Sequence, residues 1–359
     1  MPELTLHDIA ERASVSKSTV SRVINHDPHV NTNTRARVEE VIRATGFTPN
    51  AAARALVSQL SGTIGLVLPH SVSMFFTDPY FPHLVKGVSQ ACNKHNMIMA
   101  LFLADSAEDQ KNLFARVTRK GLLDGVVVQS GHHGDQTLIH QLVNSRLPTL
   151  VAGRPLFEKD ASYIDIDNVA AASKAVTHLI ACGCQRIATL TGPSESAVGV
   201  DRLQGYWQAL VQAGLPLDRE LVVESDFTEL GGYNGAKALL KAKPDGLFAA
   251  SDLTAIGAIR ALREAGLCVP GDVAVVGFDD MPIPQVTDLG LTTIRQPVVQ
   301  FGVKAAEMLL EMIQNPSHPR LIEIMETELV IRKTCGYNLL AGHGGENQPA
   351  FSRDLINYR

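Results

Sequence analysis

The sequence predicts an α/β protein with an N-terminal all-α helix-turn-helix head and two Rossmann-like lobes. Three observations support this fold class. Apolar residues recur at helical spacing over the first 60 residues, between short polar turns. Beyond Gly62, short apolar runs alternate with amphipathic helical stretches, the arrangement typical of parallel sheets with crossover helices. The chain of 359 residues also exceeds what one compact core usually holds, so two lobes are expected.

The head is predicted to contain three short helices followed by an alanine-rich helical stub. Ser16 is a good N-cap for the second helix, and Asn31 or Thr32 can cap the third. Gly46 provides a C-terminal stop for the third helix. The expected helices cover residues 6–13, 17–25 and 32–45, and the stub covers residues 51–57.

Each lobe is predicted to be a parallel sheet whose strands are buried on both faces, because the apolar runs are nearly continuous. The expected strands are residues 64–68, 97–103, 125–128, 149–152, 186–190, 246–250 and 273–277. The expected helices are residues 81–95, 108–120, 168–182, 202–213, 231–241 and 252–265. The last residues mix Gly, Asn, Gln and Pro without any period, so a flexible tail is expected there.

Composition and charge exclude several classes of protein. Hydrophobic residues make up 45% and charged residues 19%, which is ordinary for a globular protein. The net charge is −5, so charge alone does not indicate a nucleic-acid-binding part. No apolar segment approaches the roughly 18 to 20 residues of a membrane span, and the N-terminus lacks the pattern of an export signal. A cytoplasmic location is therefore expected.

No cofactor, metal site or catalytic apparatus is predicted. The five cysteines are scattered, and Cys182 and Cys184 lack the two-residue spacer and second pair of a zinc site. His132 and His133 have no acidic or cysteine partners at ligand spacing. Residues 69–71, Pro-His-Ser, follow the first strand of the lobes in place of a glycine-rich phosphate loop, and a nucleophile elbow is missing. These absences argue against an enzyme, including an NAD-dependent one.

The second helix of the head has side chains suited to reading DNA. Lys17 and Arg22 can donate to guanine O6 and N7, and Ser18 can donate or accept at a base edge. Small polar residues suited to phosphate oxygens accompany them, namely Thr5, Ser16, Thr19, Ser21, Asn25, His29 and Thr34. On this pattern alone, a DNA-binding helix-turn-helix and an ordinary solvated helical hairpin both remain open.

Motifs in a fixed order run from the head to the end of the second lobe. They include residues 5–10 (TLHDIA), 15–25 (VSKSTVSRVIN), 46–56 (GFTPNAAARAL), 64–67 (IGLV), 202–206 (RLQGY), 252–257 (DLTAIG) and 275–280 (VVGFDD). Together they strongly resemble the signature of the lactose-repressor (LacI/GalR) family of bacterial transcriptional regulators. The similarity extends from residue 4 to about residue 336.

The resemblance implies a homodimeric transcriptional repressor that binds a pseudo-palindromic DNA operator. A small effector, expected to be a sugar, would control operator affinity allosterically from between two lobes of periplasmic-binding-protein type. The expected parts are a DNA-binding domain (1–49), a hinge helix and linker (50–61), an effector-binding and dimerisation domain (62–336) and a tail (337–359). The alternative is a cytoplasmic or exported sugar-binding protein without a regulatory role, but the export signal that a transport component needs is missing.

The hinge helix is expected to fold only when the dimer and DNA support it, because about eight residues cannot hold a helix alone in water. The resemblance implies that Leu56 of each subunit wedges into the minor groove and kinks the duplex. Ala53 is small enough to let two such helices approach, and Asn50 begins the segment. An ordinary apolar linker residue is the alternative for Leu56.

The resemblance also places candidate effector-binding residues in the cleft between the lobes. Arg202 is expected to clamp the effector and Asp279 to accept from its hydroxyls, with a structural salt bridge between them as the alternative. The other candidates are His70, Phe81, Arg154, Phe227 and Ser251. Two departures from the family stand out: Ser251 replaces an asparagine of several sugar-responsive members, and residues 71–79 form a longer stretch that can reshape one cleft wall.

Overall fold

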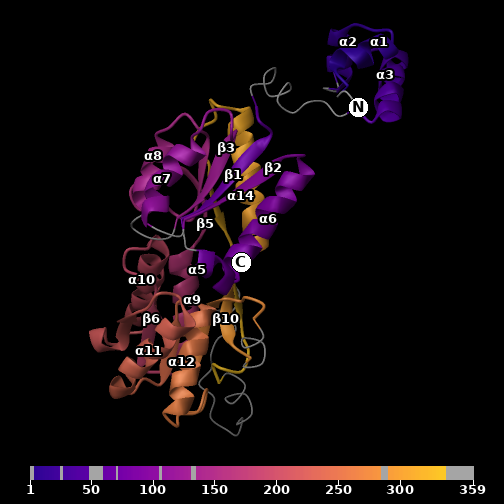
Figure 1. The fold of residues 1–359 in the computed structure, drawn as a ribbon. Helices are drawn as coiled ribbons and strands as arrows, with labels where there is room; N and C mark the ends of the chain where they lie inside the picture. Colours follow the sequence, from indigo (N-terminus) through magenta and orange to yellow (C-terminus); the bar gives the residue numbers. More distant parts are fainter. Residues whose placement is uncertain are drawn as a thin grey trace. The chain divides into compact units, whose positions relative to one another are not determined.

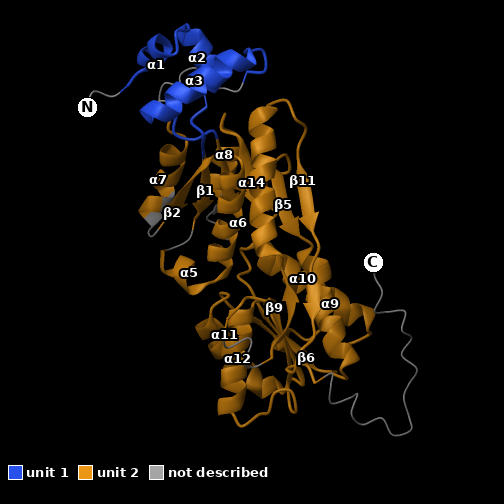
Figure 2. Cartoon of the chain, turned by 90° about the vertical axis from the view of Figure 1, so that its right-hand side faces the viewer, with its two compact units in different colours: residues 1–63, 120–124 blue, residues 64–119, 125–359 orange. Residues whose placement is uncertain are grey.

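The computed structural model describes residues 4–24, 27–47, 60–69, 72–104, 107–130, 135–283 and 290–336. The chain forms two compact units, which Figure 2 shows in different colours. Unit 1 holds the helical head and ends at Thr63, with residues 120–124 added to it, and unit 2 holds the rest. Asp124 is buried and accepts hydrogen bonds from the backbone N–H groups of Ser61 and Gly62.

The described part of the head contains the three predicted helices around one small core. They are α1 (Leu6–Arg12), α2 (Lys17–Ile24) and α3 (Thr32–Thr45). Ile9, Val20 and Val38 are fully buried, one from each helix, so the apolar spacing in the sequence identified the packed faces. The predicted stub at residues 51–57 lies outside the described residues.

Caps set the ends of these helices. Thr5 forms a capping box with Asp8, in which the hydroxyl accepts from the Asp8 N–H and the carboxylate accepts from the Thr5 N–H. Ser16 accepts from the N–H of Thr19 at the start of α2, as predicted. Gly46 ends α3 with a φ of 62°, a left-handed conformation that glycine adopts at little cost.

Lobe 1 of unit 2 is a six-stranded sheet in the order β11-β5-β4-β3-β1-β2, with helices on its faces (Figure 1). Its strands are β1 (Thr63–Leu68), β2 (Ile98–Leu103), β3 (Gly125–Gln129), β4 (Thr149–Ala152), β5 (Ser162–Ile166) and β11 (Ile322–Met325). Its helices are α5 (Val72–Thr77), α6 (Tyr80–Lys94), α7 (Ala107–Val117), α8 (Asp135–Val143) and α14 (Val298–Gln314). The pairs β1·β3, β3·β4, β4·β5 and β5·β11 are parallel.

Lobe 2 is a second six-stranded sheet, in the order β12-β10-β9-β8-β6-β7. Its strands are β6 (Ile187–Thr191), β7 (Val222–Glu224), β8 (Gly246–Ala249), β9 (Ala274–Asp279), β10 (Thr292–Arg295) and β12 (Glu328–Val330). Its helices are α9 (Asn168–Ala181), α10 (Ala197–Gln212), α11 (Glu229–Leu239) and α12 (Asp252–Glu264), with short 3-10 turns at Arg219–Leu221 and Leu240–Ala242. The β10·β12 pair is antiparallel.

Within the described residues the chain passes between the lobes three times. The passages lie between β5 and α9, between β10 and α14, and between β11 and β12. Lobe 1 therefore takes α14 and β11 from the C-terminal part of the sequence. Helix α14 packs closely on α6, because a Cβ at Gly87 would stand 2.1 Å from the carbonyl oxygen of Val299.

The predicted strands and helices of the lobes are all present, with ends within a few residues, except that the helix expected from Arg202 begins five residues earlier. Strand β2 is not buried on both faces as predicted: it lies at the sheet edge, and Ile98 is 65% exposed. The sequence analysis missed β5, β7, β10, β11, β12, α5, α8 and α14. No helix among the described residues is long and apolar enough to cross a membrane.

Candidate functional site

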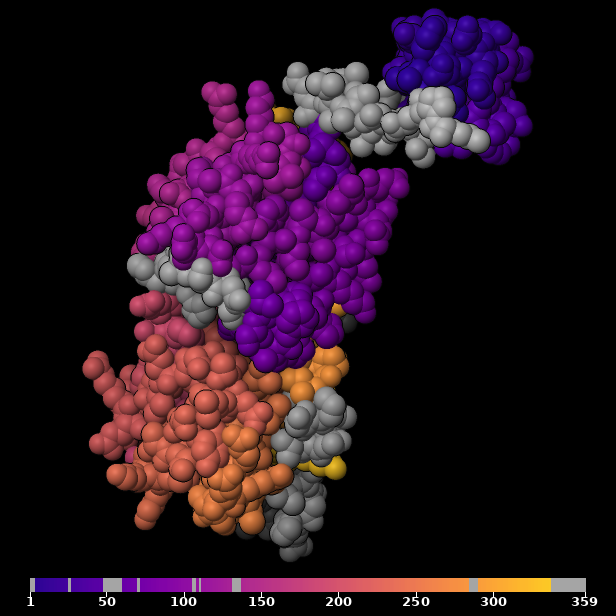
Figure 3. Space-filling view, in the orientation of Figure 1, coloured from indigo at the N-terminus to yellow at the C-terminus, as the bar shows by residue number. Residues whose placement is uncertain are grey.

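A cavity lies where lobe 1 meets lobe 2, a boundary that Figure 3 shows as the change from purple to orange atoms. Several of its polar side chains follow the carboxyl ends of parallel strands, where open α/β sheets usually hold ligands. Lobe 1 contributes Met74, Asp78, Tyr80, Phe81, Gln129, Ser130, Gly153, Asp165 and Phe301. Lobe 2 and its connections contribute Asn168, Ser196, Val198, Arg202, Phe227, Ser251, Asp279 and Gln296.

Arg202 lies at the centre of the polar contacts and is only 5% exposed. Its Nε donates to the Asn168 side-chain oxygen at 2.9 Å, and its Nη1 donates to the carbonyl oxygen of Ala250. The guanidinium carbon stands 3.5 Å from the centroid of the Phe278 ring, a close cation–π contact. These contacts fix the guanidinium rigidly, while its Nη2 makes no hydrogen bond to a described residue.

Asp279 pairs with Arg202, because its Oδ1 lies 3.6 Å from the Arg202 Nη1. The same oxygen accepts a hydrogen bond from Gln296 Nε2 at 2.5 Å. The backbone of Asp279 has a φ of 117°, a rare conformation for a residue with a side chain, and strain of this kind gathers at functional sites. Burial raises the pKa of Asp279 to about 7, although the nearby Arg202 charge acts in the opposite direction.

Two more carboxyl groups share the cavity with Asp279. Burial raises the pKa of Asp165 to about 6, against the lowering effect of the Ile166 and Arg154 N–H groups that it accepts from. Burial also raises the pKa of Asp78. Because the pKa values of Asp165 and Asp279 lie near neutral pH, these two carboxyl groups can donate or accept hydrogen bonds according to their protonation state.

Phe227 presents its ring to the cavity from a left-handed backbone conformation, with a φ of 64°. A Cβ at position 192 would stand 2.0 Å from the Phe227 Cζ, so only glycine at 192 leaves room for the ring. Phe81 lines the opposite lobe and is 5% exposed. Both aromatic residues expected at the cavity therefore lie in its wall.

Ser251 lines the cavity, and its hydroxyl also serves as the N-cap of α12. It accepts from the N–H of Thr254 at 3.1 Å and donates to the carbonyl oxygen of Phe227 at 3.2 Å. The next residue, Asp252, is 1% exposed and holds the Met281 N–H and the Thr293 hydroxyl. Asp252 thus ties α12 to neighbouring segments of lobe 2.

Among the described residues, Arg154 is the one expected effector residue that does not line the cavity. Arg154 uses its side chain to bridge the lobes: its Nη2 and Nε donate to the Asp201 carboxylate at 2.6 and 3.0 Å. Arg154 does follow the end of β4, as predicted, but its neighbour Gly153 lines the cavity in its place. His70 lies outside the described residues.

Several lining residues were missed in the sequence. Gln129 and Ser130 directly follow the apolar run of β3, and that position could have marked them. Asp165 lies in β5, a strand that was not predicted because polar residues interrupt its apolar pattern. Met74 and Asp78 belong to the long stretch at residues 71–79, which does contribute to one wall. The Gln129 Oε1 is buried and has no hydrogen-bond partner in the part of the chain that the structure describes.

Helix α2 of the head carries the residues expected to read DNA. Lys17, Ser18 and Arg22 are exposed, and the buried face of the helix is formed by Val20 and Val23. The Arg22 side chain is 68% exposed and lies 3.8 Å from the Asp27 carboxylate. The Ser18 hydroxyl hydrogen-bonds with Ser16 at 2.7 Å.

Most of the expected backbone-contacting residues lie at least partly on the surface. Thr5, Ser16 and His29 are exposed, and Thr19, Ser21 and Thr34 are half-buried. His29 lies 3.0 Å from Asp27, measured from its Nδ1 to the carboxylate. Asn25 and the hinge residues Asn50, Ala53 and Leu56 lie outside the described residues.

A helix-turn-helix with basic and hydroxyl side chains on its second helix, together with a two-lobed unit whose cavity is lined by polar and aromatic side chains, is typical of a ligand-responsive DNA-binding protein. Residues 5–50 match the family described as bacterial regulatory proteins of the lacI family. Residues 176–335 match the periplasmic binding protein-like domain.

Relatives that match over nearly the whole chain are also bacterial transcriptional regulators. The HTH-type transcriptional regulator CelR of Thermobifida fusca is 36% identical over 334 residues, which cover 92% of this chain and 98% of CelR. The ribose operon repressor of Haemophilus influenzae is 33% identical over the same shares of the two chains. The chain belongs to the LacI family of bacterial transcriptional regulators.

Solved structures agree with the fold and the family. A complex of the transcriptional regulator CelR with cellobiose has a TM-score of 0.73 and 34% identity, and the match covers 92% of this chain and 99% of that one. The lac repressor dimer bound to operator and the anti-inducer ONPF has a TM-score of 0.75 and 26% identity, with the same coverage. The predicted regulator class is confirmed over that of a sugar-binding protein without a regulatory role.

Proposed function

We propose that this regulator is a cytoplasmic homodimeric repressor whose operator affinity is set by a saccharide bound between its lobes. The observation that carries the effector proposal concerns Gln129, which lines the cavity and whose buried Oε1 has no hydrogen-bond partner among the described residues. Leaving a buried acceptor unsatisfied costs about 1–3 kcal/mol. A saccharide hydroxyl that donates to this oxygen would recover that cost.

The other lining groups suit a polyol as well. The Arg202 Nη2 can donate to a hydroxyl, and the Asp279 carboxylate can accept from one. The rings of Phe227 and Phe81 offer apolar faces to the C–H surface of a sugar. The solved relative that holds cellobiose supports a sugar as the ligand class.

A ligand in this cavity would couple to DNA binding through the angle between the lobes. Gln129 belongs to lobe 1, whereas Arg202 and Asp279 belong to lobe 2, so one ligand contacts both. The Arg154–Asp201 ion pair also joins the lobes and would respond to any change of angle. The ligand shifts the equilibrium by its difference in affinity for the two arrangements.

The head would read the operator through α2. We assign base contacts to Lys17, Ser18 and Arg22, whose side chains are exposed on one helix. Phosphate contacts are assigned to Thr5, Ser16, Thr19, Ser21, Asn25, His29 and Thr34. Asn50, Ala53 and Leu56 are assigned to the hinge, with Leu56 entering the minor groove. The solved lac repressor is a dimer on its operator, which supports the homodimer proposed for this chain.

To identify the effector, the unfolding temperature of the full-length protein is measured with a panel of sugars, including cellobiose and ribose, and with free nucleosides. The expected result is one class of saccharide that raises the unfolding temperature by mass action and also changes operator affinity in a gel-shift titration. A compound that stabilises the protein without changing operator affinity would contradict the regulatory coupling. A panel in which only nucleosides stabilise the protein would contradict the saccharide assignment.

A further inference from the structure

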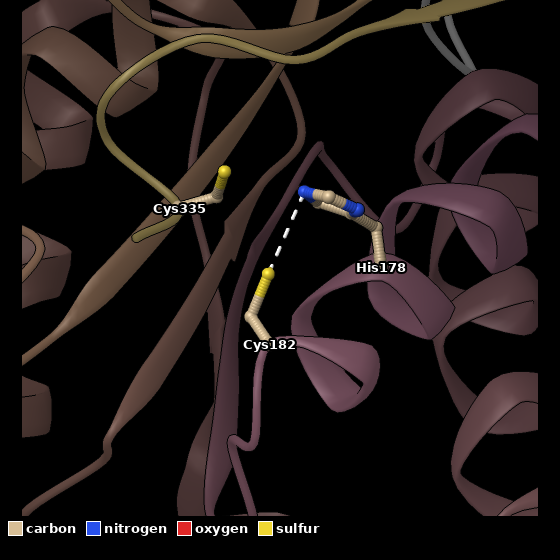
Figure 4. Close-up of side chains that lie close together, drawn as sticks. All are labelled: His178, Cys182 and Cys335. Atoms are coloured by element: carbon tan, nitrogen blue, oxygen red, sulfur yellow. Dashed lines mark hydrogen bonds between the residues drawn. The ribbon is translucent and has the colours of Figure 1, made fainter. Parts of the chain in front are cut away.

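A cluster of metal-ligating side chains lies in lobe 2, outside the effector cavity. His178 lies in the last turn of α9, Cys182 is the C-cap residue of that helix, and Cys335 lies in the segment after β12 (Figure 4). Their nearest ligand atoms, one imidazole nitrogen and two thiol sulfurs, all lie within 4.8 Å of one another. No other such group of three occurs among the residues that the structure describes.

The distance between the Cys182 and His178 ligand atoms matches a tetrahedral thiophilic ion. The Cys182 Sγ lies 3.6 Å from the His178 Nε2. Zinc bonds of about 2.3 Å to sulfur and 2.0–2.1 Å to nitrogen, at a tetrahedral angle, place the two atoms about 3.6 Å apart. The Cys182 and His178 ligand atoms therefore have the spacing that a shared ion needs, and the Cys335 Sγ lies within 4.8 Å of both.

We propose that His178, Cys182 and Cys335 bind one Zn²⁺ ion. Two thiolates and a neutral imidazole balance the charge of Zn²⁺, and such balance matters because Cys335 is 1% exposed and His178 8% exposed. A monovalent ion such as Cu⁺ would leave a net negative charge in this buried place. Cys182 is only half-buried, so water can occupy the fourth position.

The bound ion would join two segments that are far apart in the sequence. Residues 178 and 182 are one helical turn apart, which places both on one face of α9. Cys335 lies more than 150 residues later, next to Thr334, whose hydroxyl donates to the carbonyl oxygen of Val275. The ion would thus fasten the segment after β12 to the C-terminal end of α9. The usual short cysteine spacing is absent, which explains why the sequence pattern showed no metal site.

The test uses the full chain, free of any affinity tag, reduced and stripped of metal with a chelator. Titration with Zn²⁺ against a chromogenic chelator is expected to show one ion per chain, and Co²⁺ is expected to give a thiolate-to-cobalt absorption band. Cys182→Ser, Cys335→Ser and His178→Gln should each lower Zn²⁺ affinity by more than the roughly 10- to 100-fold that outer-sphere changes cause. Cys268→Ser, an exposed cysteine of the same lobe, is the matched control and should bind as the parent does.

Zinc should also raise the unfolding temperature of the parent and of Cys268→Ser, but not of the three ligand variants. Circular dichroism confirms that each variant is folded. Folded ligand variants that keep the parent's Zn²⁺ affinity would overturn the proposal, and so would a parent that takes up no Zn²⁺. A Co²⁺ complex without the thiolate band would overturn it as well, because cysteine would then not be a ligand.

Discussion

Arg202 combines two requirements that usually conflict. It is buried and held by Asn168, Ala250 and the Phe278 ring, yet it lines a cavity where a ligand can reach it. The sequence analysis left open a ligand clamp or a structural salt bridge with Asp279. The geometry is compatible with both, since Nη1 takes part in the structural contacts and Nη2 is left for a ligand.

Replacing Arg202 with alanine is expected to remove the effector response while operator binding without effector persists. The substitution leaves the Ala250 carbonyl and the Asn168 amide without their partner, so a loss of several kcal/mol in stability accompanies it. The measurement is operator affinity with and without the effector, at a temperature where the variant is folded. A variant that still responds would contradict the assignment.

Gln129→Met tests the same cavity with little cost to the fold. Methionine removes the unpartnered Oε1 and also the bond from Nε2 to the Ser130 carbonyl, so the free energy of unfolding should stay within about 1 kcal/mol of the parent. Effector affinity should fall about tenfold, since about 1.4 kcal/mol of hydrogen bonding to the ligand is lost. Calorimetric titration measures it, and an unchanged affinity would place the ligand elsewhere in the cavity.

The carboxyl group of Asp279 predicts a pH dependence of stability. Its pKa is raised to about 7 in the folded protein, so the fold binds its proton more tightly than the unfolded chain does. This group therefore stabilises the protein at low pH, and the contribution is lost as the pH rises from about 4 to about 7. Asp279→Asn should flatten that part of the stability curve and, at pH 8, raise the free energy of unfolding by at least about 1 kcal/mol.

Urea unfolding of both proteins across this pH range measures the difference. Asn keeps an oxygen for the Gln296 bond and tolerates the left-handed backbone, so the comparison isolates ionisation. Two parallel stability curves, with no convergence toward low pH, would show that the Asp279 carboxyl ionises at its ordinary pKa.

At the scale of elements, one face of α2 packs on the rest of the head and another face is exposed to solvent. Val20 and Val23 hold the helix on the head, while Lys17, Ser18 and Arg22 are exposed to solvent. Arg22→Ala should weaken the preference for operator over random DNA by about 1–3 kcal/mol for each base-reading arginine that is lost. Arg43→Ala removes another exposed arginine of the head, from α3, and is the control. Equal losses of affinity for both DNAs in the Arg22 variant would reassign Arg22 to phosphate.

The sequence predicted elements best where burial left a simple pattern. The apolar runs of β1, β3 and β8 and the caps Ser16 and Gly46 were identified because period and cap chemistry are local signals. Strand β5 was missed because Tyr163 and Asp165 interrupt its apolar residues, and Asp165 faces a cavity that forms only when the lobes meet.

Local sequence patterns could not predict the role of residues whose partners lie far away in the sequence. Arg154 was expected at the cavity because it follows a strand end, but Asp201 of the other lobe binds its guanidinium. The zinc candidate His178–Cys182–Cys335 was missed for the same reason, since Cys335 reaches α9 only through the folded sheet of lobe 2.

At the scale of the whole molecule, one chain supplies one reading head, so a dimer should need two half-sites in phase on the DNA. Inserting about 5 base pairs between the half-sites turns them to opposite faces of the duplex, which repeats every 10–10.5 base pairs. We expect specific affinity to fall to that of a single half-site, and an insertion of about 10 base pairs to restore part of it. Gel-shift titration measures both, and indifference to the 5-base-pair insertion would contradict the dimeric reading.

Lobe 1 combines β1 to β5 from the N-terminal part of unit 2 with α14 and β11 from its C-terminal part. This order has a consequence for the synthesis of the protein. A ribosome makes β1 to β5 first, but α14 and the edge strand β11 follow only after most of lobe 2 has been translated. Gly125 of β3 packs against Leu309 and Ile313 of α14. The face of the early strands that α14 covers therefore stays exposed until that helix has been synthesised. The first lobe to leave the ribosome is therefore completed late, and nascent chains that end before residue 298 should depend on chaperones.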